Sequence, residues 1–345
     1  MSYVSTTYNS NITILYRQEV RLVDGYDLPV YGISDDTFYI VHIPAIACIC
    51  ISFICAVAVI GYSFYHQNCS TFFQWTKSER FVVYMALCDA LFNISHFCDH
   101  THIVVTKSFP MPKSLCAFYG FILAEFVTAQ NLMVNIVAIN VFVLIYFRKQ
   151  IDFGRWDYRL LVYVFGVPAV GATIAATLGK FCPSGAFCYI DAVKGQMTYI
   201  FFTTVPLLLI LVSNTVMYIV SWFRIYTETR EIKSSLGKSS RAIRASHKAA
   251  KTMSLFVTAF FVQWWALAVY GLLQLIGSVP AIMVNLTTTF SNIGGLLNGI
   301  VFITIIRRKR EKSEEKGSSD KAGSGGTTSS HINSKVHSTN TQSAV

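Results

Sequence analysis

Charged side chains are scarce in this chain of 345 residues, because Asp, Glu, Lys and Arg together make up only 13% of it. A soluble domain has about 25% charged residues. Hydrophobic residues make up 53% of this chain, with 26 Phe and 18 Tyr. So little polar surface cannot cover a water-soluble core of this size. The composition therefore excludes an ordinary soluble enzyme, a disordered chain and a collagen-like fibre.

Lysine and arginine are absent from seven long apolar stretches of the sequence. A bilayer core is about 30 Å thick and takes about 20 mostly apolar helical residues to cross. The sequence therefore predicts an all-α membrane protein, a bundle of seven transmembrane helices. The predicted spans are Val41–Phe64, Phe81–Val105, Leu115–Phe147, Leu160–Leu178, Met197–Phe223, Thr252–Ile276 and Ala281–Ile306.

All 28 basic residues lie in the tails and loops, and their distribution predicts the topology. If the N-terminal tail (residues 1–40) is extracellular, the outer segments carry 6 basic residues and the inner segments carry 22. Cytoplasmic loops carry the excess of Lys and Arg. We therefore expect a cytoplasmic C-terminal tail (residues 307–345), largely disordered after about Glu311. The basic charge indicates contact with acidic lipid rather than with nucleic acid.

Two short motifs lie in the predicted tails. Asn11 begins an Asn-Ile-Thr sequence on the predicted outer side, which makes it a candidate glycosylation site. The chain ends in Ser343-Ala344-Val345. A hydroxyl residue such as Ser343, two positions before an apolar C-terminal residue such as Val345, resembles a ligand of PDZ domains. We therefore expect a glycoprotein, with a PDZ-domain protein as a candidate partner.

The nine cysteines lack the Cys-x-x-Cys spacing of metal sites. Six of them fall in spans or on the inner side, where cysteine is most simply a small apolar residue. Cys116, Cys182 and Cys188 fall on the predicted outer side, where oxidising conditions favour a disulfide. We expect a Cys116–Cys188 bond that ties a loop over the third helix, and Cys182 is the alternative partner of Cys116.

Three acidic residues, Asp89, Asp99 and Glu125, lie inside the spans. A charge in hydrocarbon costs at least ~2.5 kcal/mol, so such residues usually face the bundle interior and matter for function. Polar residues at helical spacing accompany them and predict a hydrated cavity or a polar network. For any single Asn or Thr, the alternative is an ordinary helix–helix hydrogen bond. The polar stripes are Asp89, Asn93, His96 and His100; Glu125, Thr128, Asn131 and Asn135; and Thr288, Ser291, Asn292, Gly295 and Asn298.

The longest predicted inner loop, Arg224–Lys251, is strongly basic. Four of its basic residues recur at spacings of three and four, which places them along one face of a predicted helix. They are Arg241, Arg244, Lys248 and Lys251. Such a face binds anionic lipid or docks a cytoplasmic partner.

Several of these residues resemble motifs of the G-protein-coupled receptor superfamily, over about residues 40–310. The run Leu87-Cys88-Asp89-Ala90-Leu91 resembles the second-helix motif whose aspartate binds sodium. The run Asn298-Gly-Ile-Val-Phe302 resembles the seventh-helix motif Asn-Pro-x-x-Tyr. Phe260 and Trp264 stand in the places of the activation-linked aromatic residues, and the pair Cys116 and Cys188 matches the family disulfide.

Other positions depart from the rhodopsin-like pattern. The third span ends in Asn140-Val141-Phe142 rather than Asp-Arg-Tyr, and the usual prolines of the sixth and seventh spans are missing. Gly294-Gly295 before Asn298, and the loop Cys188-Tyr189-Ile190-Asp191, look more like the cyclic-AMP-receptor and secretin-like side of the superfamily. The chain thus resembles the superfamily while mixing features of its subfamilies.

The resemblance implies a plasma-membrane receptor that transmits an extracellular ligand signal to a heterotrimeric G protein by helix rearrangement. It implies a conformational network of Asp89, Phe260, Trp264, Asn298 and Phe302, with a sodium ion at Asp89. The candidate ligand-pocket residues are Asp99, His100, Glu125, Trp264, Tyr270 and Asn292. The residues expected to face the G protein or lipid are Arg148, Lys149, Arg241, Arg244, Lys248 and Lys251.

Other classes of function fit the sequence less well. It contains no nucleophile–base motif and no phosphate-binding glycine loop, so no catalysis is expected. A transporter or channel that uses the polar stripes as a pathway is the alternative, although many transporters have internal repeats and this sequence has none. A retinal protein needs a Schiff-base lysine in its seventh span, and Ala281–Ile306 contains no lysine. No retinal cofactor is therefore expected.

Overall fold

The computed structural model describes residues 22–34, 36–234, 241–277 and 279–307. Within these residues, seven helices are long and apolar enough to cross a membrane, which confirms the predicted seven-helix membrane fold. They are Phe38–His66, Lys77–Thr106, Lys113–Phe147, Arg155–Thr177, Gln196–Glu228, Ser254–Ile276 and Ala281–Arg307. Asn11, Ser343 and Val345 lie outside the described residues, as do the side chains of Arg241, Arg244, Lys248 and Lys251.

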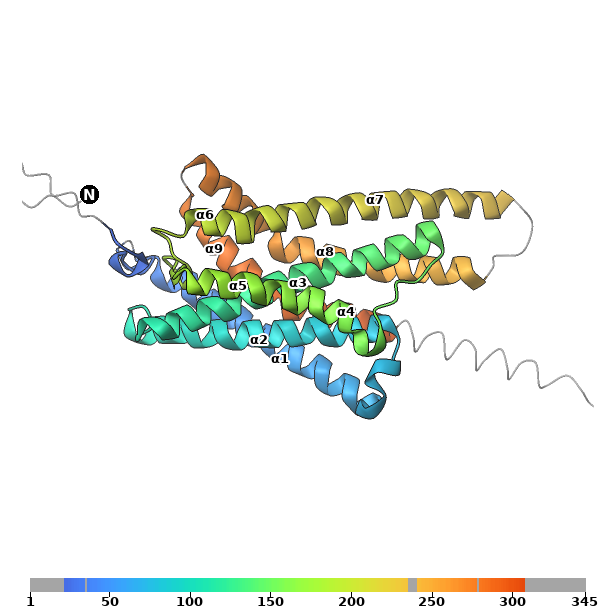
Figure 1. Cartoon of the computed structure of the whole chain (residues 1–345), viewed down its shortest axis with the longest axis horizontal. Helices are drawn as coiled ribbons and strands as arrows, with labels where there is room; N and C mark the ends of the chain where they lie inside the picture. The colour runs from blue at the N-terminus through green and yellow to red at the C-terminus, as the bar shows by residue number, and fades with distance from the viewer. Residues whose placement is uncertain (1–21, 35, 235–240, 278, 308–345) are drawn as a thin grey trace, which may run out of the picture. The chain divides into compact units, whose positions relative to one another are not determined.

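The elements follow one another along the chain as Figure 1 labels them. The first three helices are α1 (Phe38–His66), α2 (Lys77–Thr106) and α3 (Lys113–Phe147), with short turns η1 (Gly25–Asp27) and η2 (Cys69–Gln74) before α1 and α2. The fourth segment comprises η3 (Arg155–Asp157), α4 (Tyr158–Leu161), η4 (Val162–Gly166) and α5 (Val167–Thr177). Strands β1 (Phe181–Pro183) and β2 (Cys188–Ile190) lead to α6 (Gln196–Tyr199), η5 (Ile200–Thr204) and α7 (Val205–Ser234). The last elements are α8 (Arg241–Ile276), α9 (Ala281–Phe290) and η6 (Ser291–Ile293), and the helix then continues to Arg307.

Two prolines explain the irregular turns in the fourth and fifth segments. Both η4 and η5 are π-helical turns, and each ends two residues before a proline, Pro168 or Pro206. Proline lacks an N–H, and its ring clashes with the carbonyl four residues earlier. That carbonyl lies inside the wider π turn in both cases, at Val164 and Phe202. The helices therefore continue through both prolines instead of ending there.

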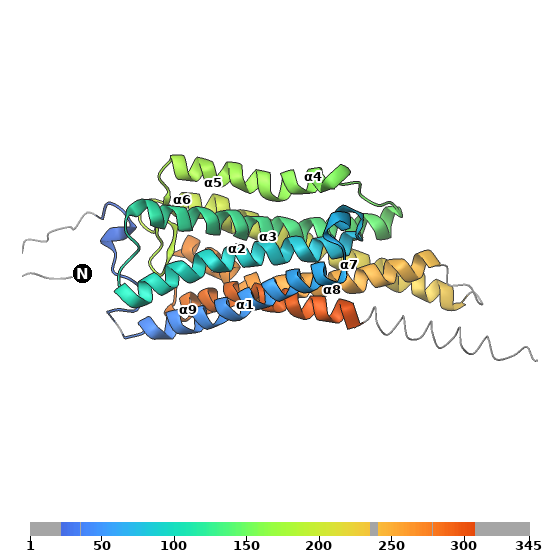
Figure 2. The ribbon, with the colours of Figure 1, turned by 90° about the horizontal axis from the view of Figure 1, so that it is seen from below.

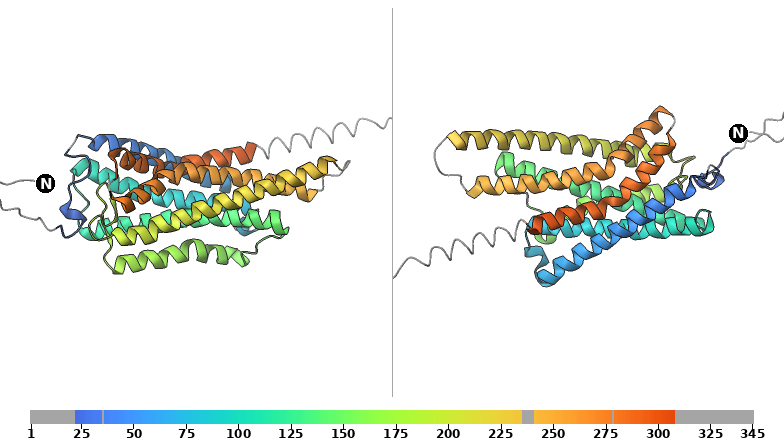
Figure 3. Two further views of the ribbon diagram at one scale, coloured as in Figure 1. Left: turned by 90° about the horizontal axis from the view of Figure 1, so that it is seen from above. Right: turned by 180° about the vertical axis from the view of Figure 1, so that it is seen from behind.

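The described part of Met1–Phe302 forms one compact unit with α3 at its centre. α3 packs against α2, α5, α7 and α8, and both strands contact it. Figures 2 and 3 show α1, α2 and α3 in neighbouring positions, in agreement with the packing of α2 between the other two. Residues 303–345 are assigned to a second unit, of which the structure describes the helical residues 303–307.

The burial pattern is that of a protein in an apolar solvent. Large apolar side chains lie on the outside, for example Ile54, Val162 and Leu209, each more than three-fifths exposed. Polar side chains such as Asp89 and Asn292 are fully buried among the helices. In lipid, polar groups must find their partners inside the protein. The buried polar groups of the described residues are therefore expected to bond one another across the helices.

Gly295 allows α1 and the seventh segment to approach closely. A Cβ atom at Gly295 would lie 2.2 Å from the backbone oxygen of Ser52. The hydroxyl of Ser52 donates a hydrogen bond of 2.5 Å to the backbone oxygen of Asn292, which holds the two helices at this distance. A side chain at Gly295 would force them apart.

We therefore expect Gly295→Ala to destabilise the protein by about 1–3 kcal/mol, the range for overpacking. The measurement is the midpoint of thermal unfolding of the purified protein in detergent. Gly61→Ala is the matched control, since a Cβ at Gly61 in α1 meets nothing within 4 Å and alanine is the better helix former. Equal midpoints for the two variants would show that the helices are not in close contact at Ser52.

Candidate functional site

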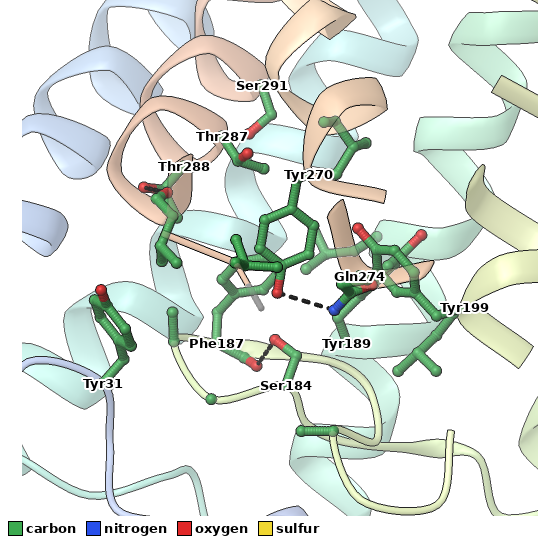
Figure 4. A pocket seen from close by; sticks show the side chains of 18 of the residues that line it. Tyr31, Ser184, Phe187, Tyr189, Tyr199, Tyr270, Gln274, Thr287, Thr288 and Ser291 are labelled. Atoms are coloured by element: carbon green, nitrogen blue, oxygen red, sulfur yellow. Dashed lines mark hydrogen bonds between the residues drawn. The ribbon is translucent and has the colours of Figure 1, made fainter. Parts of the chain in front are cut away.

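A cavity of about 370 Å³ lies between helices α2, α3, α6, α8 and α9 and the loop that joins β1 to β2. Aromatic side chains and hydroxyl groups make up much of its walls (Figure 4). The aromatic residues are Tyr31, Phe92, Phe187, Tyr189, Tyr199, Trp264 and Tyr270, and the hydroxyl residues include Ser184, Thr287, Thr288 and Ser291. An apolar cavity with a few polar groups is the usual form of a small-molecule site.

The β1–β2 hairpin forms one wall of this cavity. Its strands are antiparallel, with Cys182 opposite Tyr189 and Pro183 opposite Cys188. The N-terminal segment lies on the hairpin turn, because the N–H of Tyr31 donates a bond of 2.9 Å to the oxygen of Gly185. The N-terminal segment and the hairpin, which are distant in sequence, thus meet at the cavity wall.

A disulfide and a buried carboxylate fix the hairpin to the bundle. The structure contains the predicted disulfide Cys116–Cys188, and Cys182 is a free, buried cysteine. Burial and the nearby charge of Asp191 raise the pKa of the Cys182 thiol to about 12. Asp99 Oδ2 accepts a bond of 2.7 Å from the backbone N–H of Cys188. Asp99 therefore positions the loop.

The structure separates the six candidate ligand-pocket residues into two groups. Trp264 and Tyr270 line the cavity, whereas Asp99, His100, Glu125 and Asn292 are not among its lining residues. Asp99 is hydrogen-bonded to the loop at Cys188. His100 and Asn292 belong to the hydrogen-bonded chain described next. Glu125 is buried in α3, and its Oε2 makes no hydrogen bond within the described residues.

Three buried histidines form a hydrogen-bonded chain from α1 through α2 to the seventh segment. His42 Nδ1 lies 2.8 Å from His100 Nδ1, and His100 Nε2 lies 3.1 Å from His96 Nε2. His96 Nδ1 lies 2.8 Å from Asn292 Oδ1. His96 also lines the cavity, so the chain reaches the cavity wall.

The hydrogen bonds assign one proton order to this histidine chain when the rings are neutral. Asn292 Nδ2 donates to the backbone oxygen of Thr288, so Oδ1 must accept from His96 Nδ1. The lone pair of His96 Nε2 then accepts from His100 Nε2, and His100 Nδ1 accepts from His42 Nδ1. His42 Nε2 is left as a buried acceptor without a partner in the described residues.

A second polar chain runs from the cavity to Asp89, and we call it the amide network. It comprises Gln263, Gln130, Asp89 and Asn298. Gln263 Nε2 donates to the backbone oxygen of Ser291 (3.1 Å) and to Gln130 Oε1 (3.2 Å). Gln130 Nε2 donates to Asp89 Oδ1 (2.8 Å), and Asn298 Nδ2 donates to Asp89 Oδ2 (2.7 Å). Both carboxylate oxygens of Asp89 therefore already have partners.

The groups around Asp89 do not fit a sodium ion in this arrangement. The orientation of Gln130 is fixed, because its oxygen accepts from Gln263, whose amide nitrogen also bonds a backbone carbonyl. Gln130 therefore presents its N–H to Asp89, and Asn298 does the same. Hard cations are bound by oxygen ligands. A cation at Asp89 would meet N–H donors instead.

The remaining predicted residues lie in different environments. Phe260 and Trp264 are both fully buried in α8, whereas Phe302 packs edge-to-face on Tyr62 of α1 at 5.6 Å. Arg148 follows the last residue of α3. Its guanidinium donates a hydrogen bond of 2.7 Å to Glu228 Oε2 on α7. Lys149 is exposed beside it.

Sequence reasoning did not identify three residues that hold these chains together. Gln130 and Gln263 complete the amide network, and His42 begins the histidine chain. Gln130 and Gln263 fall outside the predicted polar stripes, and His42 is an isolated polar residue in its span. The sequence indicates only that a Gln or His inside a span needs a polar partner, and not which residue that partner is.

Comparison with known proteins establishes the fold. No family model matches the sequence, and no curated protein matches it significantly. A crystal structure of squid rhodopsin is similar, with a TM-score of 0.59 and 18% sequence identity, over 78% of this chain and 81% of that chain. The polypeptide is therefore a multi-pass membrane protein with the seven-helix fold seen in squid rhodopsin, the fold of G-protein-coupled receptors.

Proposed function

We propose that the protein is a receptor of the plasma membrane, which binds a small molecule in the cavity and signals to a heterotrimeric G protein. The observation that carries this proposal is the position of Ser291. It lines the cavity, and its backbone oxygen accepts the N–H of Gln263 at the start of the amide network. Trp264, the next residue of α8, lines the cavity as well. A ligand there touches α8 and the last helix, which the Gln263–Ser291 bond joins at the start of the network.

A ligand shifts an equilibrium only as far as it binds one packing better than the other. Movement of Trp264 displaces the neighbouring Gln263, which has to keep or exchange its bonds to Ser291 and Gln130. A partly satisfied buried polar network is costly, so few arrangements are acceptable. This supports a transition between discrete packings, with Asp89 and Asn298 repartnered at its far end.

The far ends of α3 and α7 offer a site for the G protein. Arg148 and Glu228 join them by an ion pair with N–O 2.7 Å, in the part of the chain where the Asp-Arg-Tyr arginine is missing. Lys149 and the basic residues of the loop before Lys251 supply further positive charge. Cationic side chains of this kind contact acidic lipid heads and acidic partner surfaces. We assign them to the partner-binding side.

The test is nucleotide exchange on each Gα subtype, measured in cells that express the protein and are exposed to a broad small-molecule library. We expect at least one ligand to promote exchange. Gln263→Met should abolish the response while the ligand still binds, because the variant breaks the amide network. Gln274→Met is the matched control, since Gln274 lines the cavity outside this network. Ligand-dependent solute flux or current without exchange on any Gα would favour the transporter or channel instead.

A further inference from the structure

The walls of the cavity offer no counter-ion to an anionic ligand. Among the described residues that line it, none is lysine or arginine. A carboxylate, phosphate or sulfate that entered the cavity would lose its hydration without gaining an ionic partner. The side chains labelled in Figure 4 are instead hydroxyl, amide and aromatic groups. Anionic ligands are therefore disfavoured.

The cavity also lacks an accessible counter-ion for a cation. Asp191 is the one carboxylate among the described lining residues, and it is only 1% exposed. Its Oδ1 accepts the backbone N–H groups of Val193 (2.7 Å) and Lys194 (3.0 Å) in its own turn. Its Oδ2 is covered by protein atoms, with the Cys182 thiol close by. The Asp191 carboxylate is therefore almost completely covered and is held by its own turn, which disfavours an ion pair with a ligand ammonium group.

His96 is the one histidine among the described lining residues, and its ring already has hydrogen-bond partners within the protein. Both of its ring nitrogens make hydrogen bonds in the histidine chain, to Asn292 and to His100. Its ring packs edge-on against Phe187 at 4.9 Å. His96 therefore presents a ring surface to the cavity and no free polar atom.

Two hydroxyl groups in the lining remain available to a ligand. The hydroxyls of Ser291, Tyr199 and Thr287 make no hydrogen bond within the described residues that line the cavity, and that of Thr287 is covered by protein atoms. Apolar side chains such as Leu123 and Val127 of α3 complete the walls. Binding energy in such a cavity comes from apolar burial, while a few hydrogen bonds fix the orientation.

We propose that the ligand is an uncharged, mainly apolar ring compound that carries hydroxyl or carbonyl groups, hydrogen-bonded to Ser291 and Tyr199. This inference rests on the proposed receptor function and names the ligand class of the same cavity. It follows from the lack of an accessible ion of either sign among the described lining residues, together with the unpaired hydroxyls of Ser291 and Tyr199, which are not covered as that of Thr287 is.

The test compares ligands that differ only in charge. The full-length protein in lipid nanodiscs is titrated at neutral pH with three probes on each of two skeletons, naphthyl and biphenyl: the ethanol, the ethylamine and the acetate. Binding is measured by calorimetry and by saturation-transfer NMR. We expect the alcohol of at least one skeleton to bind at least ten-fold more tightly than the amine and the acetate.

Four variants place the binding in the cavity. Ser291→Ala should weaken alcohol binding three- to ten-fold, and Val127→Trp should abolish it by filling the cavity. Val170→Trp, on the lipid-facing side of α5, is the matched control and should leave it unchanged. Asp191→Asn should leave alcohol binding within two-fold, because the carboxylate is not reached.

The proposal is overturned if the acetate or the amine binds as tightly as the alcohol, or if Asp191→Asn removes amine binding. It is also overturned if no alcohol shows binding that Ser291→Ala or Val127→Trp weakens. These binding assays contain no G protein, so a failure of the proposed ligand class can be distinguished from a failure of the proposed receptor function. Alcohol binding without nucleotide exchange would contradict that function alone, and exchange driven by an ionic ligand would contradict the ligand class alone.

Discussion

Replacement of Asp157 by alanine is expected to lower the free energy of unfolding by about 3–5 kcal/mol, as for other buried ion pairs that lose one partner. Asp157 Oδ2 lies 2.6 Å from Arg80 Nε, and Oδ1 lies 3.0 Å from Nη2. The two side chains are only 4% and 10% exposed. Without Asp157, the guanidinium stays charged and buried without its counter-ion. The measurement is the midpoint of thermal unfolding in detergent, supported by the surface expression level.

Asp152→Ala is the matched control in the same loop. Asp152 pairs with Arg159 at 3.8 Å, and its side chain is 81% exposed. Exposed pairs contribute about 0–1 kcal/mol, so this variant should unfold close to the parent protein. The double variant Arg80→Met, Asp157→Leu should recover part of the loss, because it leaves no buried charge. A loss below 1 kcal/mol in Asp157→Ala would show that water reaches the ion pair.

The Arg80–Asp157 pair also explains an unusual backbone. Trp156 and Asp157 both have left-handed φ angles, of 62° and 54°. Such angles cost of order 1–3 kcal/mol in residues other than glycine and persist only where the surroundings hold them. The guanidinium of Arg80 holds Asp157 in place, and the hydroxyl of Tyr84 donates a hydrogen bond of 3.1 Å to Asp157 Oδ2. The loop after α3 is thereby fixed to α2.

The seven helices could be predicted because span length and hydrophobicity are local properties of a sequence. The role of Arg80 could not be predicted in the same way. Arg80 stands one residue before the predicted start of the second span at Phe81. At that position the sequence indicates only an exposed charge in a loop. Its burial depends on Asp157, 77 residues away, and on how the intervening loop folds back.

The polar interior was predicted only in part, for a related reason. Helical periodicity selects one face of a helix, but α3 is surrounded by other helices and has polar partners on several faces. The predicted stripe contains Asn135, which donates 3.0 Å to Asn214 on α7. Gln130 points to Asp89 on α2 instead. Which face meets which neighbour is a property of the packing and not of the spacing.

Replacement of Cys188 by alanine is expected to cost about 2–5 kcal/mol of stability, the usual loss on removing a native disulfide. The bond joins residues 72 positions apart and ties β2 to the start of α3. Its loss frees a hairpin that forms one wall of the cavity, so small-molecule binding should weaken together with stability. The midpoint of thermal unfolding and the affinity of a cavity ligand measure the two effects.

Cys182→Ala distinguishes loss of the bond from loss of a buried cysteine. Cys182 lies in β1 of the same hairpin and is free and buried. The thiolate is the form that exchanges disulfides. Burial raises the pKa of the Cys182 thiol to about 12, so the folded hairpin disfavours the thiolate that would exchange with the Cys116–Cys188 bond. Cys182→Ala should therefore lose much less stability than Cys188→Ala. Equal losses, or a Cys116–Cys182 bond found by peptide mapping of Cys188→Ala, would show that the hairpin accepts either partner.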